Sequence, residues 1–377
     1  MDVADVEAVP IRRELEEPIA NAQKWISARE YCLVRVTLDD GTVGWGECWG
    51  PVAGNREILE DRVAPALEGE DVRDVARLHD DLHFDLRAAY HSTVPAGVVS
   101  GVDIALWDAY GKAVGQSVSR LLAERRRDEV RAYATGGFFR DVGDFDELRD
   151  VVVSEAVGHV DAGFDAVKQK IGLARHFDWG IDEDVALVRA VREAVGDDVR
   201  LMADANHAYD YADAEEVAHR LADLDVHFFE EPVRPQHVDS YARLNDAAAV
   251  SLAGGECWAF QHEFDRVIDA GAVDYVQPDV TSAGGITSTA RVASAADAAG
   301  IQCVPHVFGS AIALAASLQA IATVPGAPML EFDRTPNPIR EGIVETPVTN
   351  DGNAVPIPDR PGIGVEVDPD ALAEFRI

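Results

Sequence analysis

Two of the four lysines in this 377-residue chain flank a single glutamine, in the sequence Lys168-Gln169-Lys170. Residues 166–172 have the apolar alternation and closing glycine of a short β-strand, which places both ammonium groups on one face, about 7 Å apart. They could be solvated residues of an edge strand, but their apolar neighbours favour a buried strand, where an unpaired lysine is costly. Because a second amine beside it would lower the pKa of Lys170, we interpret Lys170 as a candidate general base.

Acidic residues end three of the strands predicted after it, at Asp204, Glu230 and Glu256. In a parallel barrel the carboxyl ends of neighbouring strands meet at one mouth, so these three carboxylates would face one another. Three facing carboxylates ionise together only beside a cation, and hard oxygen ligands of this kind select Mg²⁺. Each acid could instead be an ordinary N-cap of the helix after its strand, but the recurrence at three strand ends favours a metal site.

The following strand ends carry Asp279 and His306, and Glu331 ends the eighth strand. Adjacent strands lie about 4.8 Å apart, so Asp279 can hold the imidazole, fix its tautomer and raise the basicity of its free nitrogen. A lone histidine is more often a core residue, but His306 would face Lys170 across the barrel and is therefore a candidate second base. The implied chemistry is proton abstraction next to a carboxylate. The metal and Lys168 withdraw charge, and an enediolate forms between two opposed bases.

A repeat of short apolar strand, loop and amphipathic helix begins near residue 129 and carries these side chains. From Asp204 to Glu331 the strand ends recur at intervals of 26, 26, 23, 27 and 25 residues, the length of one βα unit. Helical periodicity lies between them, for example at 182–195 and 288–299. Eight such strands predict a barrel of the TIM type.

The residues outside this repeat form two further parts. Residues 1–125 contain a predicted β-hairpin and three helical segments, which indicates an α+β module. The tail, 336–377, is rich in proline and glycine, has strand-like segments at 354–357 and 364–367, and could run back to that module. We therefore predict a barrel at 126–335 under an α+β capping domain made of the first and last parts of the chain.

Composition excludes several classes of partner. The net charge of −35 argues against nucleic acid, which needs a basic face. No apolar run approaches the roughly 20 residues of a membrane span. The cysteines are scattered and the acidic start of the chain lacks the order of a secretory signal, so we expect reduced thiols and a cytoplasmic protein. Acidic excess with few lysines suggests a halophilic surface, adapted to concentrated salt that screens self-repulsion.

Taken together, these motifs resemble the enolase superfamily, in its mandelate racemase subgroup, over essentially the whole chain. The motifs are Lys168-x-Lys170, Asp204-x-Asn206, Glu230-Glu231-Pro232, Gly255-Glu256, Asp279 and His306. The resemblance implies an α/β fold, a modified (β/α)7β TIM barrel with an α+β cap, and one Mg²⁺ per subunit. It also implies a small-molecule carboxylate as substrate and a homo-oligomer.

The resemblance also implies a role for each motif residue. The residues that match the family's metal site are Asp204, Glu230 and Glu256 as ligands, supported by Asn206. Lys170 resembles the base on one face of the substrate, while Lys168 would contact the substrate carboxylate. His306 with Asp279 resembles the base on the other face, and Glu331 would hydrogen-bond the substrate carboxylate.

Four shorter stretches are similar, within the subgroup, to galactarolactone cycloisomerases: 40–48, 131–136, 331–338 and 357–362. Such an enzyme opens an acid-sugar lactone by β-elimination, and its carboxylate leaving group, with a conjugate-acid pKa of about 4, needs little acid assistance. A related acid-sugar dehydratase would expel hydroxide, and a racemase or epimerase would use both bases in turn. Residues 20–27, where capping loops of the family select the substrate, depart from the pattern, so the identity of the sugar acid stays open.

Two other classes compete with this interpretation. A barrel that binds a carboxylate or metal without turnover would need neither Lys170 nor His306, so the pair of bases speaks against it. A hydrolase is disfavoured, because the chain has no Gly-x-Ser-x-Gly elbow and no His-Glu-x-x-His motif.

Overall fold

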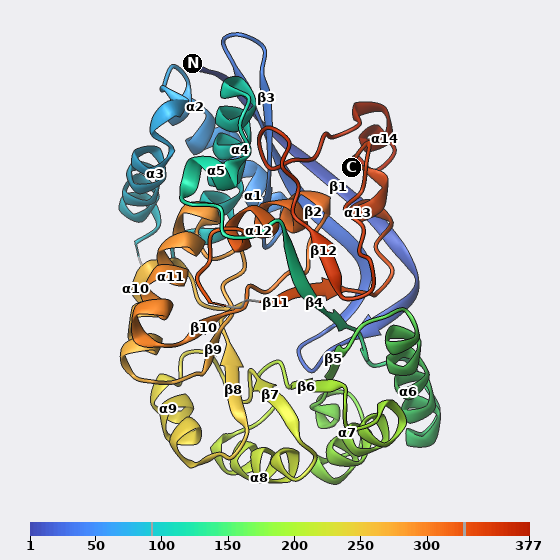
Figure 1. Cartoon of the computed structure of the whole chain (residues 1–377). Helices are drawn as coiled ribbons and strands as arrows, with labels where there is room; N and C mark the ends of the chain where they lie inside the picture. Colours follow the sequence, from blue (N-terminus) through green and yellow to red (C-terminus); the bar gives the residue numbers. More distant parts are fainter. Residues whose placement is uncertain (92, 327–328) are drawn as a thin grey trace.

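The computed structural model describes residues 1–91, 93–326 and 329–377, which form a curled parallel sheet ringed by helices and a second, α+β layer (Figure 1). The predicted fold class, a modified (β/α)7β TIM barrel with an α+β cap, is confirmed. Among the described residues, none of the helices combines the length and the apolar character that crossing a bilayer requires.

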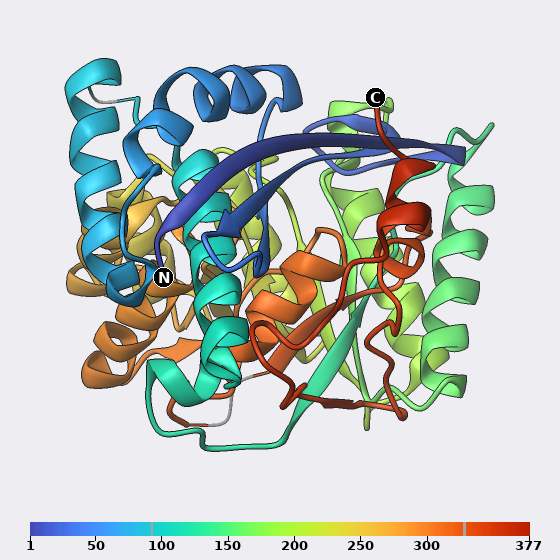
Figure 2. The same ribbon diagram turned by 90° about the horizontal axis from the view of Figure 1, so that it is seen from above.

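The cap is built on a three-stranded antiparallel sheet of β1 (Val3–Ala20), β2 (Trp25–Leu38) and β3 (Val43–Cys48), in that order. Its long strands β1 and β2 arch across the molecule (Figure 2). The predicted hairpin corresponds to β2 and β3, whereas the charged residues 12–17 hid the apolar alternation of β1. The helical segments of the cap are α1 (Val52–Ile58), a π-helical turn (Leu59–Val63), α2 (Ala64–Leu67), a 3₁₀ turn (Val72–Asp74), α3 (Val75–Tyr90), α4 (Ala96–Val114) and α5 (Val118–Leu122).

Two glycines allow strand β3 to pack directly on helix α4. A Cβ atom on Gly46 would lie 1.8 Å from the carbonyl oxygen of Gly101, and one on Gly44 would lie 2.2 Å from that of Ala105. Since protein interiors are close-packed, any larger residue at these positions would separate the sheet from the helix. The Gly-Trp-Gly sequence of the hairpin therefore sets the distance between strand β3 and helix α4 in the cap.

The barrel has eight parallel strands that pair in sequence order from β4 to β10, with β11 returning to pair with β4. The strands are β4 (Glu129–Thr135), β5 (Ala166–Lys170), β6 (Arg200–Asp204), β7 (Val226–Glu230), β8 (Ser251–Gly254), β9 (Tyr275–Val276), β10 (Gln302–Cys303) and β11 (Met329–Asp333). Within the described residues no ladder joins β10 to β11. The backbone N–H of Val307, just after β10, instead donates to the Glu331 side chain on β11 (3.3 Å).

One helix follows each of the first seven barrel strands and covers the outside of the sheet (Figure 1). These helices are α6 (Phe145–Asp161), α7 (Ile181–Val195), α8 (Tyr211–Ala222), α9 (Val238–Ala247), α10 (Phe260–Asp269), α11 (Gly285–Ala299) and α12 (Ala311–Ile321), with a 3₁₀ turn at Leu173–Arg175 before α7. Aspartates cap two of them: Asp144 accepts from the N–H of Glu147 (2.9 Å), and Asp210 accepts from that of Asp213 (3.0 Å). Such caps satisfy amides that have no partner inside the helix.

The tail contacts both parts of the molecule. It contains α13 (Pro338–Gly342), β12 (Ala354–Pro356) and α14 (Pro369–Ala373). Strand β12 pairs antiparallel with β4, so the first strand-like segment of the tail joins the barrel. Val365 and Val367 of the second segment lie in one apolar cluster with Val9 of β1, so this part of the tail does return to the cap. The last residues also return to the cap, where Arg376 bridges to Ile11 and the carbonyl of Phe375 accepts from the N–H of Arg12 (2.8 Å). The proposed domain boundaries themselves stay predictions.

Glu47, near the end of β3, joins the cap to the barrel. It is buried, and its carboxylate accepts from the backbone N–H of Ser310 (3.0 Å) and from the Ser310 hydroxyl, at the start of α12. Burial raises the pKa of Glu47 to about 7, although the hydrogen bonds from Ser310 act in the opposite direction. This interface therefore holds a carboxyl group that titrates near neutral pH.

We expect Glu47→Gln to weaken the pH dependence of stability. The unfolded chain releases this proton near pH 4.5 and the folded chain near pH 7, so the folded state binds more protons in that window. The wild-type free energy of unfolding therefore falls as pH rises through it, by about 3 kcal/mol from this group, and the variant should not show that loss. Urea unfolding across this pH range measures the difference, with the exposed Glu57→Gln of α1 as control. Equal slopes for Glu47→Gln and wild type would contradict the assignment.

Candidate active site

An apolar layer fills the barrel interior, and its members come from all eight strands or the residue next to them: Tyr133, Ala166, Met202, Phe228, Ala253, Tyr275, Val304 and Met329. Side chains alternate along a strand, so the residue two positions later points inward again, one layer nearer the carboxyl end. On seven strands that residue is polar: Thr135, Lys168, Asp204, Glu230, Gln277, His306 and Glu331. These side chains form a polar ring at the carboxyl end of the barrel.

Strand β8 departs from this spacing because Gly255 occupies the ring position. Its φ is +153°, and a Cβ atom there would lie 2.6 Å from the backbone of Gln277, so only glycine fits. The acid of this strand follows one residue later, as Glu256. Oxygens of Asp204, Glu230 and Glu256 all lie within 4.8 Å of one another, so the three acids do meet, and one oxygen from each can hold a divalent cation.

Asn206 lies beside these acids in the turn after β6. Its N–H donates to Oδ1 of Asp204 (2.9 Å), and its side chain is 2% exposed. Both side-chain polar atoms, Oδ1 and Nδ2, are buried without a hydrogen-bond partner. Because buried polar groups are nearly always paired, these atoms fit a hydrated cation beside the carboxylates better than they fit a closed core.

Both lysines of β5 are buried and point to this cluster, on the common face expected of the strand. Nζ of Lys168 lies 2.6 Å from Oε1 of Glu230 and 2.8 Å from Oε1 of Glu331, and Lys170 pairs with Asp204. The predicted lowering of the Lys170 pKa is wrong for this arrangement. Burial and the charge of Lys168 do lower it, but the Asp204 carboxylate outweighs them and raises the pKa above its ordinary value.

His306 contacts the cluster from the other side. Its Nδ1 lies 2.6 Å from Oδ2 of Asp279, as the spacing of adjacent strands predicts, and its Nε2 lies 3.0 Å from Oε2 of Glu256. Burial lowers the pKa of His306, but the carboxylates of Glu256, Glu331 and Asp279 outweigh burial and raise it to about 10. The edge of the Trp49 ring, from the cap, faces the imidazole with ring centres 6.3 Å apart.

Glu331 lies between the two cationic groups. It contacts Lys168 on one side, and its Oε2 is 3.9 Å from Nε2 of His306 on the other. Burial disfavours the ionised carboxylate, but Lys168 and His306 outweigh it and bring the pKa of Glu331 to about 2. Glu331 therefore stays ionised and holds both cations in the ring.

Two ring residues were not among the predicted site residues. Gln277 donates from Nε2 to Oε2 of Glu230 (2.8 Å), and the Thr135 hydroxyl donates to Oε1 of Glu331 (2.7 Å). Each orients a carboxylate that also binds Lys168. Both residues could have been found in the sequence because each lies two positions after a buried residue of its strand. That spacing directs a side chain inward whether it is neutral or charged.

The turn between β1 and β2 lies against loops of the barrel. Ala20 and Phe139 exchange two backbone hydrogen bonds (3.0 and 2.8 Å), and Nε2 of His176 lies 2.8 Å from the carbonyl oxygen of Asn21. The aromatic ring of Phe138, beside Phe139, has Nζ of Lys170 at 4.9 Å from its centre. The start of residues 20–27, at Ala20, is thus anchored on the loop after β4 that also borders Lys170.

A barrel with acids at three successive strand ends, facing lysines on one side and a His–Asp pair on the other, defines the site of an enolase-superfamily protein. Residues 3–123 match the family model of the mandelate racemase / muconate lactonizing enzyme N-terminal domain, and residues 151–371 match that of the enolase C-terminal domain-like family. The chain belongs to the mandelate racemase / muconate lactonizing enzyme branch of the enolase superfamily.

Similar proteins span the whole chain. It is 39% identical over 385 residues to D-galactarolactone cycloisomerase of Agrobacterium fabrum, which covers 100% of this chain and 99% of that protein. It is 33% identical over 350 residues to arabinonate dehydratase of Saccharolobus solfataricus, covering 92% of this chain and 91% of that one. Among solved structures, 3,6-anhydro-D-galactonate cycloisomerase from Zobellia galactanivorans has a TM-score of 0.89, 33% identity and full coverage of both chains. A racemase from Streptomyces coelicolor with bound magnesium has a TM-score of 0.88, 26% identity and the same coverage.

Proposed function

We propose that this chain is a cycloisomerase that opens the lactone of an acid sugar by β-elimination. The observation that carries the proposal is the placement of two candidate bases about one carboxylate cluster. Lys170 contacts the Asp204 end and His306 the Glu256 end, with Glu230 between them. A substrate carboxylate bound at the cluster would present its α-carbon to a nitrogen on each side.

We propose Mg²⁺ as the cofactor, one per subunit, held by Asp204, Glu230 and Glu256 with Asn206 beside them. The oxygen-only donor set and the unpartnered amide of Asn206 support this assignment. When bound, Mg²⁺ would supply Lewis acidity that withdraws charge from the substrate carboxylate and makes the adjacent C–H more acidic.

Lys168 and Glu331 are proposed to bind the substrate carboxylate. The Lys168 ammonium is fixed by Glu230 and Glu331, so it offers a positive charge that need not reorganise as negative charge develops on the enediolate. A protonated oxygen of the substrate's carboxyl group could in turn donate a hydrogen bond to Glu331. These two residues therefore orient the substrate and stabilise the enediolate without moving the proton themselves.

Lys170 and His306 are proposed to move protons. Once Asp204 serves as a ligand, Lys170 loses its main counterion and keeps Lys168 as a charged neighbour, which favours the neutral amine that a base requires. Asp279 holds Nδ1 of His306, so Nε2 is the nitrogen directed at the site. The configuration of the substrate decides which of the two bases removes the α-proton.

A lactone is the preferred substrate because its leaving group is a carboxylate, which departs without acid assistance. The second candidate is dehydration of an open-chain acid sugar. The raised pKa of His306 favours it, since a protonated imidazole can donate to a departing hydroxide. Racemisation or epimerisation would follow if the enediolate were reprotonated before elimination.

The substrate class can be tested with a panel of aldarate lactones, aldarates and aldonates in D₂O with Mg²⁺. A cycloisomerase should convert a lactone to an isomeric 2-keto acid, whereas a dehydratase should convert the open acid to a 2-keto acid with loss of one water. NMR detects both products and any exchange of the α-proton. A carboxylate-binding barrel without turnover would give neither product nor exchange, and this result would refute the proposal.

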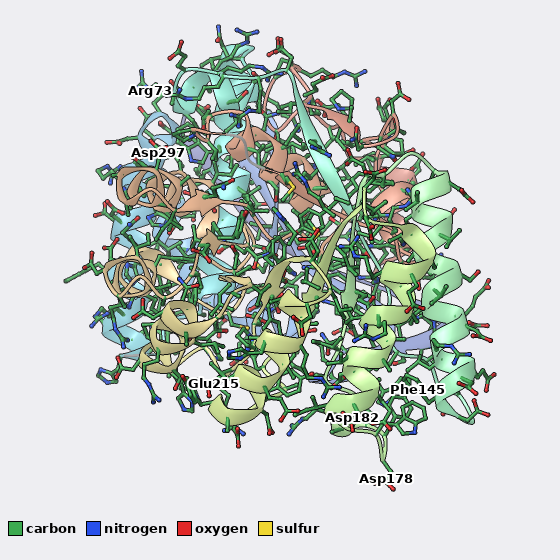
Figure 3. All side chains as sticks on the ribbon, turned by 60° about the horizontal axis from the view of Figure 1, so that its bottom comes forward. Arg73, Phe145, Asp178, Asp182, Glu215 and Asp297 are labelled. Atoms are coloured by element: carbon green, nitrogen blue, oxygen red, sulfur yellow. The ribbon has the colours of Figure 1, made fainter. Side chains whose placement is uncertain are left out.

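We also propose that the acidic surface is adapted to concentrated salt. The chain has 68 acidic residues against 33 lysines and arginines, and Asp178, Asp182 and Asp297 are exposed and point outward (Figure 3). Of the four lysines, all of which are described, only Lys24 is exposed. Arginine thus supplies nearly all of the positive surface charge.

The expected result is a higher melting temperature in concentrated salt. Raising KCl from about 0.1 M to about 2 M shortens the screening length below 3 Å, which weakens repulsion among the acids and should raise Tm on the order of 10 °C. Thermal unfolding at several KCl concentrations measures it, with sucrose as a control for preferential exclusion. Full stability and activity in dilute buffer would contradict a halophilic adaptation.

We infer a cytoplasmic location from the separate free thiols of Cys32, Cys48, Cys257 and Cys303. A homo-oligomer stays a prediction from the family resemblance, which sedimentation measurements on the purified protein would test.

A further inference from the structure

A second group of potential ligands lies beside the carboxylate cluster. We name it the outer cluster: His207, Glu231 and Cys257, whose donor atoms all lie within 4.8 Å of one another. Nε2 of His207 is 2.9 Å from Oε2 of Glu231 and 3.4 Å from Sγ of Cys257. Nothing in the proposed reaction uses these three side chains.

The outer cluster is separate from the carboxylate cluster, although the same three strand ends supply both. Glu231 and Cys257 each directly follow an acid of the first cluster, and His207 is three residues after Asp204. Backbone φ is +65° at His207 and +46° at Glu231, so the chain turns sharply between one set and the other. His207 and Cys257 line a cavity of about 690 Å³, which Asn206 also borders, whereas none of the three acids Asp204, Glu230 and Glu256 lines it.

The bonding of these atoms is incomplete without a further partner. Glu231 is 1% exposed, and its Oε2 has no hydrogen-bond partner even though Nε2 of His207 is close to it. The contact therefore lacks hydrogen-bond geometry, which leaves Oε2 of Glu231 available to a further partner. Nδ1 of His207 is also buried without a partner. The buried Glu231 oxygen calls for an ion or a water beside it, and Nδ1, on the other side of the imidazole from Nε2, calls for a partner of its own.

We propose that the outer cluster is a second metal site, for a divalent transition metal of the zinc class. In tetrahedral coordination by nitrogen, oxygen and sulfur, neighbouring donor atoms lie about 3.3–3.6 Å apart. The His207–Cys257 separation of 3.4 Å fits this range, and the His207–Glu231 separation of 2.9 Å would open slightly on binding. The thiolate and imidazole prefer Zn²⁺ to Mg²⁺, so the two sites select different metals. Binding would replace the thiol proton of Cys257, which passes to solvent.

The site has three protein ligands, and its fourth position opens to the cavity. Tyr211, Arg234 and His237 also line this cavity. A metal there would link the turns that follow β6, β7 and β8, and these turns directly follow Asp204 and Glu230 and contain Glu256. The second metal therefore ties together the backbone on which the carboxylate cluster is built.

Cobalt substitution tests the site directly. The full-length protein, with Mg²⁺ in large excess to occupy oxygen sites, is titrated with Co²⁺, and thiolate-to-cobalt absorption is recorded. Wild type should bind one Co²⁺ with this absorption, and equimolar Zn²⁺ should remove it. Cys257→Ser should abolish the band, and His207→Ala should weaken Co²⁺ binding at least about 100-fold.

Two variants serve as controls. Glu230→Gln, which alters the carboxylate cluster, and Cys303→Ser, at a buried thiol of β10, should both keep the absorption. Circular dichroism verifies the fold of each variant. If Cys257→Ser does not fold, wild type and His207→Ala decide the question. No thiolate band in wild type, or a band that survives loss of Cys257 or is unaffected by loss of His207, would overturn the proposal.

Discussion

Lys170→Ala and His306→Asn should each lower kcat by about 10²–10⁴-fold while the fold is retained. Each change removes the proton-transferring nitrogen on one side of the carboxylate cluster. Lys168 and the three acids stay in place, so substrate binding, and with it KM, should change much less. Steady-state kinetics on the substrate found by the lactone panel measures both constants. An asparagine at position 306 can still donate a hydrogen bond to Asp279. A fall in kcat in His306→Asn would therefore report loss of the base and not loss of packing.

Lys112→Ala is the matched control for the lysine variant. Lys112 is also partly buried and paired with an aspartate, Asp108, at 2.8 Å, but it lies on α4 in the cap. Its loss should reduce the free energy of unfolding without a comparable fall in kcat. Solvent exchange adds a second measurement, because each base should exchange the α-proton on its own face. Wild-type turnover in either Lys170→Ala or His306→Asn would remove that residue from the mechanism.

Glu230→Gln should weaken Mg²⁺ binding by at least about 100-fold and reduce turnover in proportion. Glu230 is the central acid of the cluster, and glutamine at this position offers a neutral oxygen in place of a charged one. The change also leaves Lys168 with Glu331 (2.8 Å) and Asp204 (3.8 Å) as its nearby carboxylates, so the ring loses one negative charge. Titration calorimetry with Mg²⁺ in the absence of substrate measures affinity independently of catalysis.

A surface glutamate provides the control for this experiment. Glu193→Gln, exposed on α7, changes net charge by the same amount and should leave Mg²⁺ affinity unchanged. Differential scanning calorimetry verifies that Glu230→Gln stays folded. An unchanged Mg²⁺ affinity in Glu230→Gln would exclude Glu230 as a ligand and with it the proposed composition of the metal site.

The barrel and its charged site residues could be predicted because their signals are local in sequence. An apolar strand that ends in a charged residue, repeated at the length of a βα unit, locates Asp204, Glu230 and Glu256 without knowledge of tertiary contacts. The pairing of His306 with Asp279 required only that consecutive strands be neighbours, which barrel topology guarantees. These features depend only on the geometry of strands and of the barrel, which does not vary with the sequence.

Other features depend on contacts between distant parts of the chain, and the sequence did not reveal them. The pKa of Lys170 follows from Asp204, 34 residues away, and not from the adjacent Lys168 alone. Gln277 and Thr135 belong to the ring through neutral hydrogen bonds that leave no charge pattern. Strand β12 pairs with β4 because the tail runs beside the barrel. The short apolar segment at 354–357 does not indicate this path.

The polar ring lies two residues after the apolar layer on each strand. Inserting or deleting one residue inside a barrel strand would therefore disrupt the site. Deleting Val167 from β5 would turn both lysines toward the surrounding helices and bring Gln169 and Ile171 to the inward positions. The segments after the strands face the same restriction up to the last site residue, since Glu256, Asp279 and His306 lie two or three residues beyond β8, β9 and β10. Natural or engineered length variation in this protein should therefore be found between strands and never inside them.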